Sequence, residues 1–258
     1  MLVGDAQQPQ RAAPAVVNGG NPFIGARPFL TPPLAAHFFC SRRTDVQELC
    51  TLIHSSRLVI LHGGAGVGKS SLLHASLLPA LVTTGCQVLE LPVNWPDEQR
   101  LAWLAQTRQH LSAQDTVLVV DPADALAADP DCLTHCLALL ADAPRLRILF
   151  SLRSPPATLL ASLLHDAGWT VAVYGLTPPP VAALAPALAA SLAHTPGADD
   201  IVARFLAALG GAAGDDTVEP VLLQLAGRAL WPNLDDAASV LAPHIDATLA
   251  AHCQRTID

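Results

Sequence analysis

Cationic side chains are scarce in this sequence, and lysine is almost missing from it. Only 14 of the 258 residues are lysine or arginine, and Lys69 is the single lysine. The formal net charge is −8, and no run of basic residues interrupts the chain. Because nonspecific nucleic-acid binding depends on clustered lysine and arginine, this composition disfavours that class of function. Apolar residues make up 51% of the chain, which is ample for a core and argues against general disorder.

Long hydrophobic runs and a cysteine framework are missing as well. Every apolar stretch of membrane-spanning length is broken by a charge, a proline or a glycine, and the N-terminus has no secretory pattern. The six cysteines show no paired framework, so we expect free thiols in a cytoplasmic protein. The spacing of Cys132, His135 and Cys136 puts them on one helical face. With no evident fourth ligand, we favour core cysteines over a metal site there.

A phosphate-binding motif stands out against this background. Residues 63–70 read G-G-A-G-V-G-K-S and match G-x-x-x-x-G-K-[ST] at every fixed position. A short apolar run at 57–62 precedes the motif, and an amphipathic helix follows at 70–77. In a P-loop of this kind, backbone N–H groups wrap the β- and γ-phosphates and the lysine bridges their oxygens. The predicted nucleotide site therefore includes Gly63, Gly64, Ala65, Gly66, Val67, Gly68, Lys69, Ser70 and Ser71.

The order of apolar runs predicts a layered α/β domain followed by a helical subdomain. Five short strands are expected at 57–62, 87–92, 116–120, 146–152 and 170–174, with helical stretches between them. Such alternation is typical of a parallel sheet covered by helices on both faces, a three-layer α/β/α arrangement. We expect a flexible leader over 1–20, the P-loop NTPase domain over 21–177, and a smaller lid-like helical subdomain over 178–258.

An aspartate after the third expected strand is the candidate second ligand for a metal ion. Residues 116–120 read T-V-L-V-V, and Asp121 follows them directly. A P-loop site holds Mg²⁺ through the serine hydroxyl of the loop, here Ser70, and an acid at such a strand end. An aspartate that merely begins a turn with the following proline is the alternative, but the P-loop upstream favours the metal ligand.

Two further residues are candidates for the hydrolytic step. Asp124 is the only acid near Asp121 in sequence that could orient the attacking water, and it is shorter than glutamate by one methylene. Arg153 ends the fourth expected strand, where it could contact the γ-phosphate and stabilise developing charge. A surface arginine at a strand end is the plainer interpretation of Arg153.

Four segments resemble the STAND class of P-loop NTPases, in particular its bacterial novel STAND branch. Residues 21–29, N-P-F-I-G-A-R-P-F, resemble N-P-Y-x-G-L-R-P-F of that branch. Residues 39–42, F-C-S-R, resemble its hydrophobic-hydrophobic-Gly-Arg motif with serine in place of glycine. Residues 68–81 resemble G-K-S-S-L-V-x-A-G-L-L-P-x-L, and residues 219–231 resemble L-P-L-L-Q-x-A-L-x-x-L-W.

This resemblance implies a sheet order of 5-1-4-3-2 and an ATP-operated switch. It places Arg42 near the base and ribose, and Pro220 against the adenine from the helical subdomain. An exposed helix-starting arginine and a helix-initiating proline are the respective alternatives. Members of the branch usually continue into a winged helix and a repeat array, and many assemble on activation. The chain ends about where a winged helix would start, so a C-terminal sensor region or a protein partner is implied.

One departure from the branch bears directly on turnover. The branch usually reads D-Q-F-E-E after its third strand, whereas this chain has Asp124 and Ala125 at the two glutamate positions. Three functions follow as hypotheses: a signalling switch with slow Mg-ATP hydrolysis, an ATP-binding scaffold without turnover, and a DNA-acting ATPase of the related AAA type. The acidic charge disfavours the third, and the absence of an N-K-x-D guanine-reading motif agrees with adenine.

Overall fold

The structure is a computed structural model of the chain. It describes residues 42–109, 111, 114–124, 126, 129–191, 199–200, 202–203, 206, 217, 219–220 and 223–224. Several expectations lie outside these residues: the leader at 1–20, the segment at 21–29, Ala125, and most of the predicted helical subdomain.

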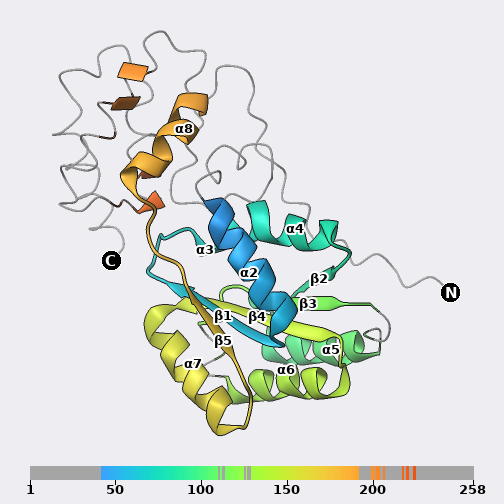
Figure 1. Cartoon of the computed structure of the whole chain (residues 1–258). Coiled ribbons are helices and arrows are strands. Elements are labelled where there is room, and N and C mark those ends of the chain that lie inside the picture. Colours follow the sequence, from blue (N-terminus) through green and yellow to red (C-terminus); the bar gives the residue numbers. More distant parts are fainter. Residues whose placement is uncertain are drawn as a thin grey trace.

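A five-stranded parallel sheet forms the centre of the described residues (Figure 1). Its strands are β1 (Leu58–Gly63), β2 (Gln87–Glu90), β3 (Thr116–Val120), β4 (Leu146–Arg153) and β5 (Ala172–Gly175). Their order is β2-β3-β4-β1-β5, which confirms both the α/β prediction and the order implied by the family resemblance. The strands also begin and end within a few residues of the predicted ranges.

The fifth strand shows the largest shift from its predicted position. It was expected over 170–174, but pairing with β1 begins at Val59↔Ala172 and ends at His62↔Gly175. Thr170 and Val171 precede the ladder because a strand at the sheet edge gains backbone hydrogen bonds only where its single neighbour runs alongside it.

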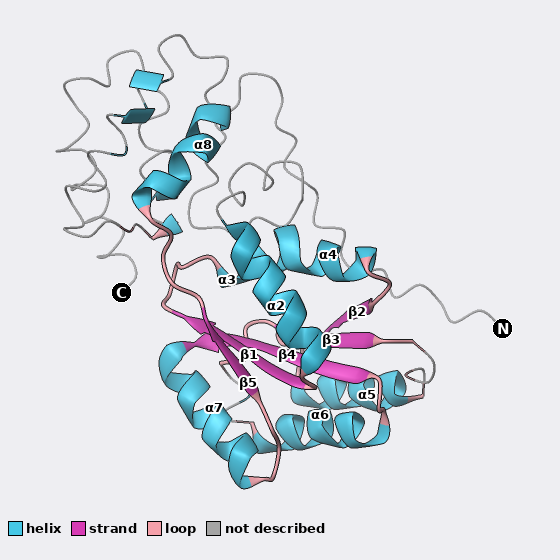
Figure 2. Ribbon diagram, viewed as in Figure 1, coloured by secondary structure: helices cyan, strands magenta, loops and turns pink. Residues whose placement is uncertain are grey.

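Helices cover both faces of the sheet (Figure 2). The helical segments are α2 (Arg43–Ser55), α3 (Lys69–Leu72), the π-helical turn η2 (Leu73–Leu77), α4 (Leu78–Thr83), α5 (Asp97–Arg108), α6 (Pro130–Asp142), α7 (Ser154–Asp166) and α8 (Val181–Ser191). Alternate residues of β1 serve the two faces: Leu58 and Ile60 lie in the core under α5, α6 and α7, whereas Val59 and Leu61 lie in the core under α2, α3 and α4. Burial on both faces explains why these strands are continuous apolar runs.

The cysteine prediction is confirmed for the described thiols, although one residue of the Cys-His-Cys group points elsewhere than expected. Cys50, Cys86, Cys132 and Cys136 are free thiols. Cys132 and Cys136 lie on α6, and both are buried in the core. His135 was expected on the same face, but it is exposed, and its Nδ1 lies 2.8 Å from the carbonyl oxygen of Asp131.

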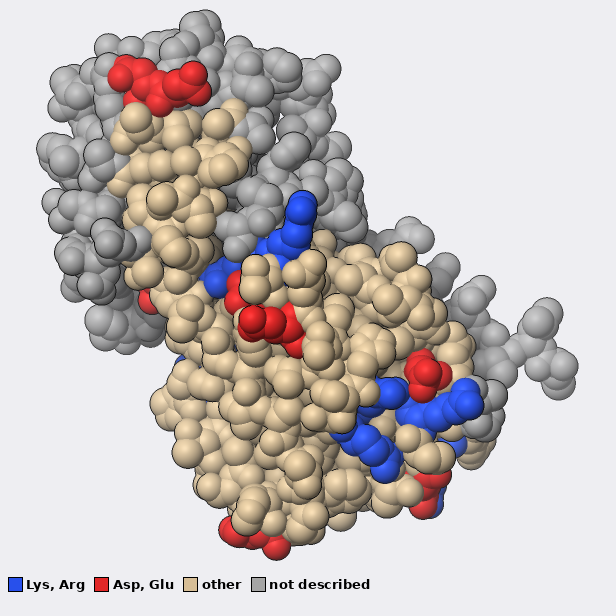
Figure 3. Space-filling model, in the orientation of Figure 1, with Lys and Arg blue, Asp and Glu red and all other residues tan. Residues whose placement is uncertain are grey.

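The surface and the helices are consistent with the composition. On the face drawn in Figure 3, charged side chains form small separate groups within a largely uncharged surface. Within the described ranges, none of the helices combines the length and the apolar character that a membrane span requires.

Candidate functional site

The predicted phosphate loop connects the carboxyl end of β1 to α3. Gly66 and Gly68 adopt positive φ angles of 79° and 97°, a backbone conformation that favours glycine. Gly63 has no room for a side chain, because a Cβ built there would lie 2.5 Å from the carbonyl oxygen of Leu176. The loop is therefore packed against the segment that follows β5, which a pattern of glycine spacings alone does not reveal.

Lys69 folds back over this loop. Its ammonium donates hydrogen bonds to the carbonyl oxygens of Gly63, at 3.0 Å, and Gly64, at 2.9 Å. Burial lowers the pKa of Lys69, while the nearby charges of Asp124 and Asp121 act in the opposite direction. The lysine and both predicted acids therefore lie within electrostatic reach of one another.

Asp121 lies just beyond β3, and its side chain is only 7% exposed. Burial by itself would raise the pKa of this carboxyl, but the nearby polar side chains of His74, Ser151 and Ser70 outweigh burial and lower the pKa. The carboxylate is thus held in its charged form beside the loop serine. Carboxylate and hydroxyl oxygens are ligands that suit Mg²⁺, so Asp121 and Ser70 fit the predicted metal site.

Asp124 and Arg153 contact each other directly. The Asp124 Oδ1 atom accepts hydrogen bonds from the backbone N–H of Arg153, at 3.1 Å, and from its Nε, at 3.0 Å. The Arg153 side chain is 61% exposed, so its charge faces solvent on one side. Both candidates for the hydrolytic step lie at the site, and in this conformation they are bonded to each other.

Arg42 is buried rather than an exposed residue at the start of a helix. Only 6% of it is accessible, and its guanidinium donates to the carbonyl oxygens of Val67, at 3.2 Å, and Thr177, at 2.7 Å. The Oδ2 atom of Asp45 lies 3.3 Å from Nη1 of Arg42 and forms an ion pair with it. Burial lowers the pKa of Arg42, against the effect of Asp45. Arg42 therefore links α2, the phosphate loop and the connection towards α8.

Pro220 lies over the phosphate loop, although it is far from the loop in sequence. A Cβ built on Gly68 would lie 3.8 Å from Cγ of Pro220. Nearby in sequence, Thr217 forms an antiparallel bridge with Pro180, which precedes α8. The structure thus brings together the loop, Asp121, Asp124, Arg153, Arg42 and Pro220, which come from positions spread over most of the sequence.

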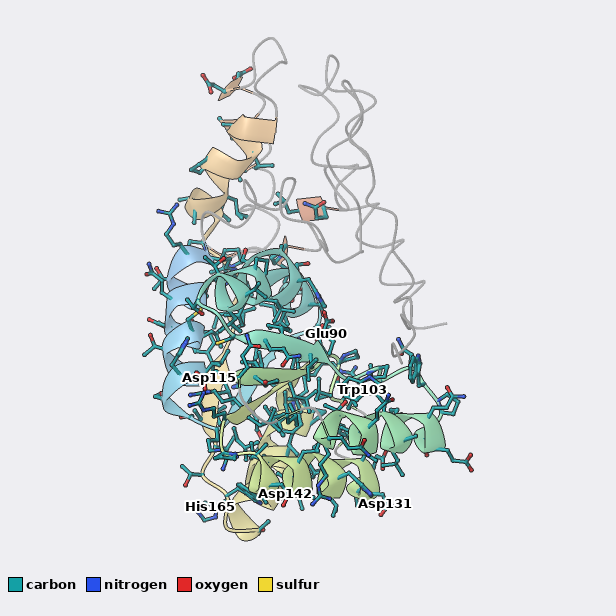
Figure 4. The ribbon with its side chains drawn as sticks, turned by 90° about the vertical axis from the view of Figure 1, so that its right-hand side faces the viewer. Glu90, Trp103, Asp115, Asp131, Asp142 and His165 are labelled. Atoms are coloured by element: carbon teal, nitrogen blue, oxygen red, sulfur yellow. The ribbon has the colours of Figure 1, made fainter. Side chains whose placement is uncertain are left out.

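Sequence analysis missed two polar residues at this site. His74 lies in the π-helical turn η2, with its Nε2 3.6 Å from Oδ2 of Asp121 and its Nδ1 3.6 Å from Oε2 of Glu90. Figure 4 shows Glu90 at the end of β2, far from His165 on α7. The spacing of His74, four residues after Ser70, was the available signal, because residues four apart share a helix face.

Comparison with solved structures identifies the fold. The chain is similar to Hsp104 in a closed state with ATPγS and casein, with a TM-score of 0.58 and 13% identity over 82% of this chain and 42% of the Hsp104 chain. It is also similar to the Drosophila ORC bound to DNA, with a TM-score of 0.52 and 19% identity over 86% of this chain and 69% of the ORC chain. The chain thus spans less than half of the Hsp104 chain. At these identities the likeness shows a P-loop fold and nothing more specific.

Comparison of sequences identifies the family. No curated protein matches the chain. The family model for novel STAND NTPase 1 matches residues 22–237, which is most of the sequence. The chain therefore belongs to the novel STAND NTPase 1 family, and it carries a nucleotide-binding module.

Proposed function

We propose that this chain is an ATP-dependent conformational switch for signal transduction that hydrolyses Mg-ATP slowly. The observation that carries the proposal is the position of Asp121, charged and buried beside Ser70 just beyond β3, the second strand after the phosphate loop. A glycine loop alone would support only anion binding. A loop with a lysine, a serine and a buried aspartate supports a nucleoside triphosphate with its metal ion.

Each residue of the site has a defined task in this proposal. The N–H groups of 63–70 surround the β- and γ-phosphates, and Lys69 releases the carbonyl oxygens of Gly63 and Gly64 to reach the phosphate oxygens. Ser70 and Asp121 would hold Mg²⁺, which when bound would neutralise charge on the phosphates.

The proposed hydrolysis is slow because its two participants are engaged with each other. Arg153 must leave Asp124 to contact the γ-phosphate, and Asp124 is then free to orient the attacking water. Aspartate at this position reaches less far than glutamate, and Ala125 offers no second carboxylate. Both features favour binding over turnover.

The proposed switch uses two contacts that join the loop to the region around α8. Arg42 hydrogen-bonds both Val67 of the loop and Thr177 of the connection that leads to α8. Pro220 packs over Gly68. A nucleotide that fits one arrangement of these contacts better than another shifts the equilibrium between them by the difference in affinity.

The primary test measures ATP binding and phosphate release for the wild type and Lys69→Ala, with and without Mg²⁺. Removing the ammonium should reduce ATP affinity at least about tenfold, since one such interaction with phosphate exceeds about 1.4 kcal/mol. His165→Ala, an exposed histidine on α7, serves as the control for surface substitution. Equal ATP binding by the wild type and Lys69→Ala would refute a nucleotide site at this loop.

A scaffold that binds ATP without turnover is the second candidate, and the Asp124–Arg153 pair favours it. If the pair persists with ATP bound, no carboxylate is free to orient water. The scaffold would be established if the wild type and Arg153→Ala both bound ATP and neither released phosphate. Phosphate release that depends on Lys69 and Asp124 would establish the switch.

A further inference from the structure

His74 lies between two carboxylates, that of Glu90 at the end of β2 and that of Asp121 just after β3. Its ring nitrogens lie 3.6 Å from Asp121 Oδ2 and 3.6 Å from Glu90 Oε2. The imidazole is 19% exposed, Asp121 is 7% exposed and Glu90 is 46% exposed. The ring therefore stands on the boundary between a buried carboxylate and a solvated one.

Three elements build this arrangement together. The parallel register of β2 and β3, with Glu90 opposite Val119, brings the ends of the two strands side by side. The helix that leaves the phosphate loop changes to a π-helical turn at Leu73–Leu77, which includes His74. Turns of this type interrupt α-helices frequently at functional sites. His74 is thus directed at Asp121 by the same helix that carries Lys69 and Ser70.

The difference in burial between Asp121 and Glu90 indicates which carboxylate accepts the hydrogen bond from the imidazole ring. A carboxylate out of contact with water depends on protein donors, whereas an exposed one is solvated and screened. The favoured tautomer accordingly carries its hydrogen on Nε2, facing Asp121. A hydrogen bond to the charged form also agrees with the lowered pKa of Asp121. Both separations are slightly longer than a usual hydrogen bond, so a small movement of the ring or carboxylate completes the contact.

We propose that His74 is a positioning residue for Asp121: its Nε2–H holds Oδ2 and leaves the other carboxylate oxygen available for the metal ion that Asp121 and Ser70 would hold. The proposal rests on the proposed function, because it assigns His74 a task at the same nucleotide site. Groups that orient a metal-ligating carboxylate affect metal affinity without contacting the metal, commonly by tenfold or more. Glu90 is then a solvent-side neighbour of the ring, and its charge contributes little.

The first measurement is the Mg²⁺ concentration that gives half-maximal enhancement of ATP binding, in the wild type and four variants. His74→Phe keeps the ring volume and removes the donor, and we expect it to need about tenfold more Mg²⁺. His74→Gln places an amide N–H near the position of Nε2, and we expect it to restore the wild-type requirement. Glu90→Gln and His165→Phe should both match the wild type. Thermal unfolding of each variant checks that the fold is intact.

The second measurement does not depend on nucleotide. Imidazole ¹⁵N signals of the free protein are recorded, and the His74 signals are assigned as those missing from His74→Phe. We expect Asp121→Asn to shift the His74 Nε2 signal more than Glu90→Gln does, because the buried carboxylate is the acceptor.

The two measurements separate failure of this inference from failure of the proposed function. A folded His74→Phe with the wild-type Mg²⁺ requirement would overturn the positioning role, as would a His74 signal insensitive to Asp121→Asn. A wild-type chain that binds no nucleotide would instead remove the proposed function, and the imidazole signals alone would then uphold or overturn the contact with Asp121.

Discussion

At the residue scale, Asp121 shows how the surroundings of one side chain determine its chemistry. The carboxyl is buried, which opposes ionisation, yet the polar side chains of three neighbours stabilise the anion and lower the pKa. Asp121 therefore carries its charge without a metal ion, as the proposed Mg²⁺ site requires. The same balance makes protein stability depend on pH in a predictable direction.

We expect Asp121 to contribute stability above about pH 4 that disappears at lower pH. Its folded-state pKa lies below the ordinary value of 3.8, so the folded state favours the ionised form. That contribution is complete above the unfolded-state pKa and is lost as the pH falls through the folded-state pKa. Urea unfolding between about pH 2 and pH 6 measures it as the difference between the wild type and Asp121→Asn. Repeating the comparison in the His74→Phe background removes the effect of the imidazole on this carboxylate. A difference independent of pH would contradict the prediction.

We expect the Asp124–Arg153 pair to matter more for nucleotide response than for stability. Arg153 is 61% exposed, and exposed ion pairs contribute roughly 0.2–1 kcal/mol. A double-mutant cycle of Asp124→Ala and Arg153→Ala, followed by urea unfolding, should give a coupling energy in that range. The rate of phosphate release should fall in both single variants. The fall, converted to a free energy, should exceed the coupling energy measured by urea unfolding. A coupling energy well above 2 kcal/mol would show that the pair is mainly structural.

At the scale of elements, the connection from β1 to α3 depends on specific glycines. Gly63 packs against the backbone after β5, and Gly68 requires a positive φ of 97°, whereas the space around Gly64 is open. One loop therefore offers two constrained glycines and a matched control within a few residues.

We expect Gly63→Ala to destabilise the protein by about 1–3 kcal/mol, because its Cβ would overlap the Leu176 carbonyl and displace that backbone. Gly68→Ala should lose about 1–2 kcal/mol through conformational strain alone. Gly64→Ala should lie within about 0.5 kcal/mol of the wild type. Denaturant unfolding of the three variants tests this order, and equal losses at all three positions would contradict the packing described.

At the scale of the whole molecule, Arg42 joins segments that are distant in the sequence. Its guanidinium bonds to residue 67 on one side and residue 177 on the other, so the loop and the chain beyond β5 share one buried cation. Figure 1 shows α8 beyond the sheet, where the chain continues from β5. In the proposed switch, this contact would transmit nucleotide occupancy towards α8.

We expect Arg42→Ala to reduce stability by about 2–4 kcal/mol, because hydrogen bonds from a charged group to two carbonyl oxygens are lost. Arg42→Lys should recover only part of the loss, since an ammonium lacks the planar fork that reaches both acceptors. Thermal unfolding with and without ATP provides the measurement. If Arg42→Lys behaved as the wild type, the two-sided contact would not be needed.

The local pattern of residues was sufficient to predict the elements and the phosphate loop. Strands buried on both faces appear as apolar runs such as 116–120, and a P-loop requires fixed residue types at fixed spacings, so both can be recognised without tertiary information. The strand order and the positions of Arg42 and Pro220 required the family resemblance, because nothing in the spacing of 42, 67 and 220 places them together.

Only the tertiary structure decided which side chains share the site and how they are engaged. The parallel strands β1 and β3 end at the same edge of the sheet, which brings Asp121 to Ser70. The ends of β2 and β3 leave Glu90 and Asp121 on either side of His74. The packing of Gly63 against Leu176 and the pairing of Asp124 with Arg153 have the same origin. Contacts between residues far apart in sequence follow from how strands and helices pack, whereas local periodicity carries information only about neighbours within a few turns.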